Sequence, residues 1–279
     1  MELWYNFIDF LLPYSWAKHF FMKNALLAVL LVTPVFGLLG TMIVNNKMAF
    51  FADSLGHSAL TGIALGVIIG IKSPLWAVLC FAVLFALAVV LVKNAQTAST
   101  DTIIGVFSST AIALGIVILS RQGGFSKYSV YLVGDLLSIS PKDIAALGLI
   151  FLVVLFIWVK MFNKLLLVSV NQSLAISRGI KVRLYEYSFA VLMALVVTVA
   201  IQWVGILIIS SLLVLPAAAS RNIANNMQQY HLYSVIFALF SGLAGLILSY
   251  FWGTATGATI VLILSLCFVL TLAYKLMRN

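Results

Sequence analysis

The chain has 279 residues, of which 64% are hydrophobic and only 8% are charged, and its mean hydropathy is +1.18. Soluble domains carry about 25% charged residues, so this composition excludes an ordinary soluble domain. The net charge of +9 comes from basic residues scattered between apolar runs, which is typical of a membrane protein and argues against nucleic-acid binding. The two cysteines, Cys80 and Cys267, both lie in apolar runs, so we expect neither a disulfide framework nor a cysteine metal site.

The first segment, residues 1–23, is rich in aromatic residues and precedes the first long apolar run. It lacks the basic start, the apolar stretch and the small-residue cleavage site of a signal peptide. We therefore expect an interfacial N-terminal segment over 1–23 and a single transmembrane domain over 24–279.

Apolar runs of about 20 residues, long enough for a helix to cross a hydrocarbon core of about 30 Å, recur along the rest of the chain. The alternating segments of about 10 residues that mark a transmembrane β-barrel are not seen. We predict an all-α polytopic membrane protein with eight or nine transmembrane helices, because only Gln202-Trp203 separates the sixth run from the seventh. The runs lie near 24–44, 50–71, 74–92, 101–120, 143–161, 186–202, 204–220, 233–250 and 256–275.

The second run contains Asp53 and His57, which are spaced to lie one turn apart on one face of a helix. An aspartate inside hydrocarbon costs roughly 2.5–3.5 kcal/mol, so such residues usually face a cavity or an ion path. A carboxylate and a neutral imidazole on one face are also two ligands of a divalent transition metal. The alternative is structural: Asp53 caps a helix that starts at Ser54, and His57 is an interior histidine bonded to a carbonyl.

Two other acids, Asp101 and Glu186, come at the starts of the fourth and sixth runs. An acid in a first turn complements the helix dipole at a water-facing end, so we assign both a structural role. Between the fourth and fifth runs, the apolar stretch 130–137 is too short to cross the membrane and is predicted to form a short, gate-like helix.

The polar segment 160–183 carries five basic residues and no acid, which places it in the cytoplasm. Alternation of the runs then puts five further basic residues on the same side and the N-terminus outside; these five are Lys47, Lys93, Arg221, Lys275 and Arg278. Within the cytoplasmic loop, here taken as 162–184, residues 171–180 predict a short helix that Gly179 ends.

Motifs for catalysis are missing from the sequence. It contains no G-x-x-x-x-G-K-[ST] for ATP, no H-E-x-x-H for zinc proteolysis and no G-x-S-x-G for serine hydrolysis. The chain is therefore expected to be no enzyme and to hold no permanent cofactor.

The chain resembles the membrane permeases of the zinc- and manganese-uptake ABC transporters, most closely those of the zinc branch. Three stretches carry the likeness: Met48 to Gly66, Tyr131 to Pro141, and Val204 to Arg221. Asp101-Thr-Ile-Ile-Gly105 and Leu174-Ala-x-x-x-Gly179 agree as well, and the order and spacing of all five extend the likeness over about 24–275.

The resemblance implies the fold of an ABC importer permease in a bacterial cytoplasmic membrane. It implies a homodimer, a separate cytoplasmic ATP-binding subunit and an extracytoplasmic metal-binding protein, with Zn²⁺ or Mn²⁺ as the transported ion. Asp53 and His57 match the acid and histidine associated in the family with cation coordination. The loop around Leu174, Ala175, Arg178 and Gly179 matches the family's coupling helix, which docks on the ATPase.

Two departures accompany the resemblance. Asn171-Gln172-Ser173 stands where an acid often precedes the Leu-Ala of the coupling loop, so docking is expected to depend more on shape and on Arg178. Thr61 stands where a proline is frequent, which predicts a straighter helix.

Two competing functions remain at this point: an ATPase-independent secondary metal or proton-coupled carrier, and a membrane scaffold. A carrier is expected to bring several ionisable groups to the midplane, whereas Asp53 and His57 stand nearly alone. A scaffold predicts that removing both side chains leaves metal uptake unchanged.

Overall fold

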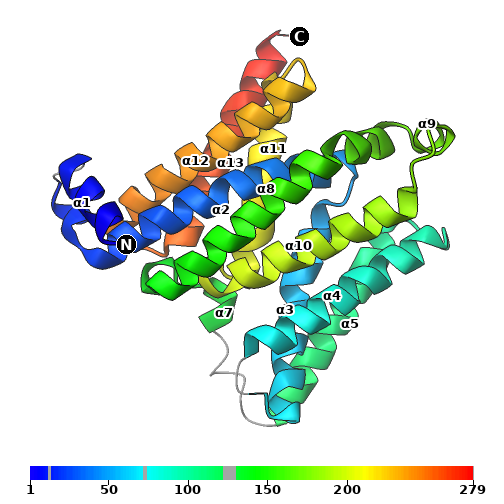
Figure 1. Cartoon of the computed structure of the whole chain (residues 1–279), viewed down its shortest axis with the longest axis horizontal. Helices are drawn as coiled ribbons and strands as arrows, with labels where there is room; N and C mark the ends of the chain where they lie inside the picture. The colour runs from blue at the N-terminus through cyan, green and yellow to red at the C-terminus, as the bar shows by residue number, and fades with distance from the viewer. Residues whose placement is uncertain (12–13, 72–73, 122–129, 279) are drawn as a thin grey trace.

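The computed structural model describes residues 1–11, 14–71, 74–121 and 130–278, and in these residues it is all-helical (Figure 1). Eight of the described helices are long and apolar enough to cross a membrane. They are α2 (Phe20–Asn45), α3 (Ala49–Ile69), α4 (Pro74–Asn94), α5 (Thr100–Arg121), α8 (Pro141–Val170), α10 (Val182–Val204), α12 (Met227–Trp252) and α13 (Thr256–Arg278). A further apolar helix, α11 (Ile206–Ile223), is shorter, and Gly205 alone separates it from α10. Each predicted run therefore corresponds to a helix.

Short elements connect or precede the long helices. These are α1 (Glu2–Leu11), a 3₁₀ turn η1 (Ser15–Lys18), α7 (Val130–Val133), a second 3₁₀ turn η2 (Leu136–Ser138) and α9 (Gln172–Ser177). The gate-like helix predicted over 130–137 is thus two short turns, interrupted at Gly134 and Asp135. Gly134 has φ +74°, a conformation that glycine adopts without strain and that ends α7.

Helix α8 defines the two ends of the molecule. Its 30 residues rise about 45 Å, well beyond a hydrocarbon core of about 30 Å. The helix begins in a capping box, in which Ser140 and Asp143 bond each other's backbone N–H, with Pro141 in the first turn. It continues to Val170, so the first part of the predicted loop 162–184 is helical and α9 lies far from η2. Figure 1 shows α9 at the right and α1 at the left end of α2.

Helix α11 lies at the centre of the bundle and packs against α2, α3, α12 and α13. Small residues allow close approach: a Cβ on Gly40 of α2 would collide with the backbone carbonyl of Leu213 in α11. In the same way, a Cβ on Gly115 of α5 would press on the backbone of Thr61 in α3. Close backbone contact through small residues is the usual way in which helices associate in lipid, where burial of apolar surface gives no driving force.

Glu186 does not have the role assigned from the sequence. It lies in the second turn of α10 rather than at a water-facing helix start, and its carboxylate accepts a hydrogen bond from Lys93 Nζ of α4 at 3.0 Å. The side chains of Lys93 and Glu186 are only 22% and 15% exposed. The pair therefore joins α4 to α10 close to the α9 end of the bundle.

We expect Glu186→Gln to lower thermal stability, because it leaves the half-buried Lys93 ammonium without its carboxylate. A lost buried partner costs roughly 1–3 kcal/mol. The double variant Lys93→Met/Glu186→Leu is expected to recover most of this loss, because it removes both charges. The measurement is thermal unfolding in detergent, with Asp101→Asn, an exposed acid on α5, as control. Equal melting temperatures for Glu186→Gln and the wild type would contradict the prediction.

Candidate functional site

Asp53 and His57 lie one turn apart on α3, as their spacing predicts. Nε2 of His57 is 3.4 Å from Oδ2 of Asp53. The helix begins at Ala49 with Met48 at its N-cap, so Asp53 is inside the helix and the alternative that it caps a helix starting at Ser54 is wrong. The carboxylate is thus free of helix capping and available to a ligand.

A third residue, Ser210 of α11, also contacts the carboxylate of Asp53. Its hydroxyl donates to Oδ1 of Asp53 at 3.2 Å, so both carboxylate oxygens have a polar neighbour. Ser210 was not among the residues predicted from the sequence. The only signal was a pair of hydroxyls, Ser210 and Ser211, in an otherwise apolar stretch that also carries the family likeness.

The contact with Ser210 fixes the depth of Asp53. Asp53 is near the start of α3, and Ser210 is near the start of α11. Asp53 contacts Ser210, while Gly56, further along α3, lies beside Ile206, nearer the start of α11, so the two helices run in opposite directions. If the two antiparallel helices began and ended at the same levels, Asp53 would lie beside the C-terminal end of α11. Instead, the first turns of α3 lie beside the first half of α11, with Gly56 of α3 against the carbonyl of Ile206. Asp53 is therefore deeper in the bundle than its position in the sequence indicates.

The segment 130–138 covers the beginning of α11. Gly205, with φ +91°, turns the chain from α10 into α11, and a Cβ there would collide with the backbone of Val133. A Cβ on Gly134 would in turn collide with the backbone at Val204 and Gly205. The two glycines allow α7 to sit directly on the turn, only a few residues along α11 from Ser210.

The cluster is partly open and chemically incomplete. The side chain of Asp53 is 36% exposed and that of His57 is 21% exposed. Within the described residues, no group of three or more His, Cys, Asp or Glu side chains is placed to hold a metal ion. One chain thus offers a carboxylate and an imidazole, two of the four ligands of a tetrahedral zinc site.

The second set of predicted residues lies on and beside α9. The side-chain oxygen of Asn171 caps this helix by accepting from the backbone N–H of Leu174 at 2.9 Å, and Gly179, with φ +71°, follows its end. Leu174 and Arg178 are exposed, whereas Ala175 is fully buried against its own chain. Helix α9 therefore packs against the rest of the chain through Ala175, and Leu174 and Arg178 are exposed. The residues predicted to bind metal and those predicted to dock on the ATPase lie at separate places in the fold.

Comparison with known proteins assigns the fold to a family. The model of the ABC 3 transport family matches residues 18–275. The chain is 33% identical to the high-affinity zinc uptake system membrane protein ZnuB of Haemophilus influenzae, over 89% of this chain and 95% of that protein. It is 31% identical to the manganese transport system membrane protein MntC of Halalkalibacterium halodurans, over 96% and 90% of the two chains.

A solved structure agrees with the sequence relatives. PsaBC from Streptococcus pneumoniae, determined in complex with a Fab, superposes with a TM-score of 0.80 over 98% of this chain and 99% of that one, at 28% identity. The family model, the relatives and this superposition each cover nearly the whole chain, so the match includes both the Asp53 cluster and α9. The chain is a multi-pass membrane permease that belongs to the ABC 3 transport family.

Proposed function

We propose that this permease imports a divalent transition metal, zinc first and manganese second, across the cytoplasmic membrane of a bacterium. The observation that carries the proposal is the Asp53–His57 pair on α3, held against Ser210 inside an otherwise apolar bundle. Carboxylate and imidazole suit both metals. The relatives support the same cargo, because their names refer to zinc uptake and to manganese transport.

The metal site is completed by a second copy of the chain. Asp53 and His57 supply two ligands, and their partial exposure leaves the pair open at the surface of one subunit. A two-fold related copy would supply a second carboxylate and a second imidazole, giving the four ligands that zinc prefers. The hydroxyl of Ser210 orients the Asp53 carboxylate and so acts as an outer partner of the metal ligand.

Energy for transport comes from a separate ATP-binding subunit that docks on α9. Leu174 and Arg178 form the exposed contact, while Ala175 holds the helix on the permease. The extra length of α8 supports this assignment, because it carries α9 past the hydrocarbon boundary into water. An extracytoplasmic metal-binding protein delivers the ion at the opposite end, where α7 and η2 lie. ATP binding and hydrolysis then open the two ends in turn.

We expect Asp53→Asn and His57→Gln each to reduce zinc uptake at least tenfold, because each removes a metal ligand. Ser210→Ala is expected to reduce uptake less than either ligand variant, because the hydroxyl only orients the Asp53 carboxylate. The measurement is radioactive zinc uptake by cells that lack their own zinc importer and express the permease with its ATP-binding subunit and binding protein.

The matched control is Ser58→Ala, which is adjacent to His57 but bonds only the Leu55 carbonyl of its own helix at 2.7 Å. Unchanged zinc uptake in the double variant Asp53→Asn/His57→Gln would remove the metal-site assignment. Repeating the assay with manganese identifies the cargo if the wild type does not take up zinc.

We expect Leu174→Asp/Arg178→Glu to abolish transport by preventing the ATP-binding subunit from docking on α9. The control Ser177→Ala removes only a hydroxyl that bonds the Leu174 carbonyl within α9, so it is expected to leave docking intact. Co-purification of the two subunits, followed by zinc uptake in proteoliposomes, tests both variants. A stable complex with normal uptake in the double variant would contradict the role of α9, and uptake without any ATP-binding subunit would favour a secondary carrier.

A further inference from the structure

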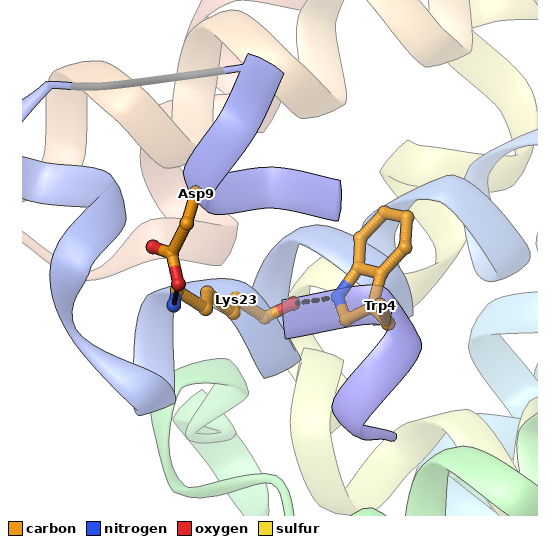
Figure 2. A network of polar contacts seen from close by, with 3 residues as sticks. All are labelled: Trp4, Asp9 and Lys23. Carbon is orange, nitrogen blue, oxygen red and sulfur yellow. Dashed lines mark hydrogen bonds and ion pairs between the residues drawn. The ribbon is translucent and has the colours of Figure 1, made fainter. Parts of the chain in front are cut away.

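The N-terminal helix α1 is firmly attached to the start of α2. Lys23, in the first turn of α2, is only 3% exposed, and its Nζ donates to Oδ2 of Asp9 at 2.6 Å (Figure 2). Trp4 Nε1 of α1 also donates to the backbone carbonyl of Lys23, at 3.0 Å (Figure 2). A buried ammonium without its carboxylate is strongly unfavourable. Because Asp9 and Trp4 both belong to α1, the buried lysine holds α1 in one orientation.

That orientation leaves one face of α1 uncovered. Ile8 is buried in the apolar cluster at this end of the bundle. Large apolar side chains at i, i+4, i+7 and i+8 form a separate stripe; they are Leu3, Phe7, Phe10 and Leu11. All four are exposed, Leu3 and Phe10 to 87%. Such a stripe in contact with water would be unfavourable.

The position of α1 identifies what covers the stripe. Its 10 residues rise about 15 Å, half of what a spanning helix needs, so α1 cannot cross the membrane. It lies where α2 begins, at the end of the bundle opposite α9 (Figure 1), and the exposed ring of Phe20 at the start of α2 packs against Tyr5 of α1. The stripe therefore lies at the level where the apolar surface of the spans ends. Amphipathic helices with aromatic residues bury this type of face in the boundary between headgroups and acyl chains.

A second set of hydrogen bonds connects α1 to the chain just after η2. The hydroxyl of Tyr5 donates to Oδ1 of Asn24 at 2.8 Å, and Nδ2 of Asn24 donates to the carbonyl of Ile139 at 3.3 Å. Asn24 is buried, and Ile139 directly follows η2. One buried amide therefore links the N-terminal helix to the η2 segment, defined here as 134–139.

We propose that α1 binds lipid at the outer surface of the membrane through Leu3, Phe7, Phe10 and Leu11, and that it braces the η2 segment through Asn24. Lipid holds α1 in the plane of the membrane, and the Tyr5–Asn24–Ile139 contacts transmit this restraint to the η2 segment, which packs against α2, α10 and α13. This inference is independent of the metal that the permease carries.

The lipid contact is tested with spin labels on the full chain in nanodiscs, in a Cys80→Ala/Cys267→Ala background. Phe10→Cys reports the apolar stripe, and Glu2→Cys, an exposed position on the polar face of α1, is the control. We expect the ratio of oxygen to nickel-chelate accessibility to be several-fold higher at position 10 than at position 2. Equal ratios would overturn the proposal. So would protection of position 10 from both reagents, because protein would then cover the stripe.

The brace is tested by hydrogen exchange in the same nanodiscs. We expect Asn24→Leu to increase exchange of the backbone amides of Leu136 to Ile139 several-fold. Leu3→Ser/Phe10→Ser is expected to have the same effect, because it weakens the lipid contact without altering Asn24. Glu2→Gln, on the polar face of α1, serves as control. Unchanged exchange in the stripe variant would show that lipid contact does not restrain the η2 segment and would overturn the bracing role.

Discussion

Asp53 reaches Ser210 because α3 packs closely against the first half of α11, with Gly56 beside the Ile206 carbonyl. A larger residue at position 56 would push the two helices apart and separate the carboxylate from the hydroxyl. The same stretch of α11 carries the turn at Gly205 on which α7 rests. The position of the proposed metal ligands and that of α7 therefore both depend on close contacts between backbones along the first half of α11, which agrees with the importance of small residues where helices meet in lipid.

The ionisable groups of the described bundle are paired in ways that suit different tasks. Asp9–Lys23 and Lys93–Glu186 each combine a carboxylate with an ammonium, so the charges balance without any ligand. Asp53–His57 combines a carboxylate with an imidazole, whose neutral form is itself a metal ligand. Each of the first two pairs joins two different helices by an ion pair, whereas the third lies within α3, and Asp53 contacts α11 only through the neutral hydroxyl of Ser210. Its chemistry is therefore available for binding.

Hydropathy and local spacing were sufficient to predict the helices, the Asp53–His57 pair and the short helix α9 followed by Gly179. Each of these depends on residues within one or two turns of each other. Ser210 and the Lys93–Glu186 pair were missed because they depend on the axial position of one helix relative to another. An apolar run has the same hydropathy wherever it is placed along the membrane normal, so the sequence contains little signal for which residues of α3 and α11 lie side by side. The end of α8 was placed too early for a related reason, because Lys160 and Lys164 suggested a loop where the helix in fact continues.

The proposed metal site, with two ligands from each of two subunits, suits transport better than a complete site in one chain. Structural zinc sites that bring four ligands together in one chain bind with apparent free energies of about 10–16 kcal/mol. At the upper end of this range, release would be far too slow for an importer, because about 16 kcal/mol corresponds to picomolar affinity. A site divided between two copies, with two ligands from each, loses its geometry as soon as the subunits move apart. Conduction depends on binding that is strong enough for entry and weak enough for exit. In the function proposed above, the partly exposed Asp53 and His57 would thus connect weak, reversible coordination to the relative movement that ATP-driven docking at α9 would produce.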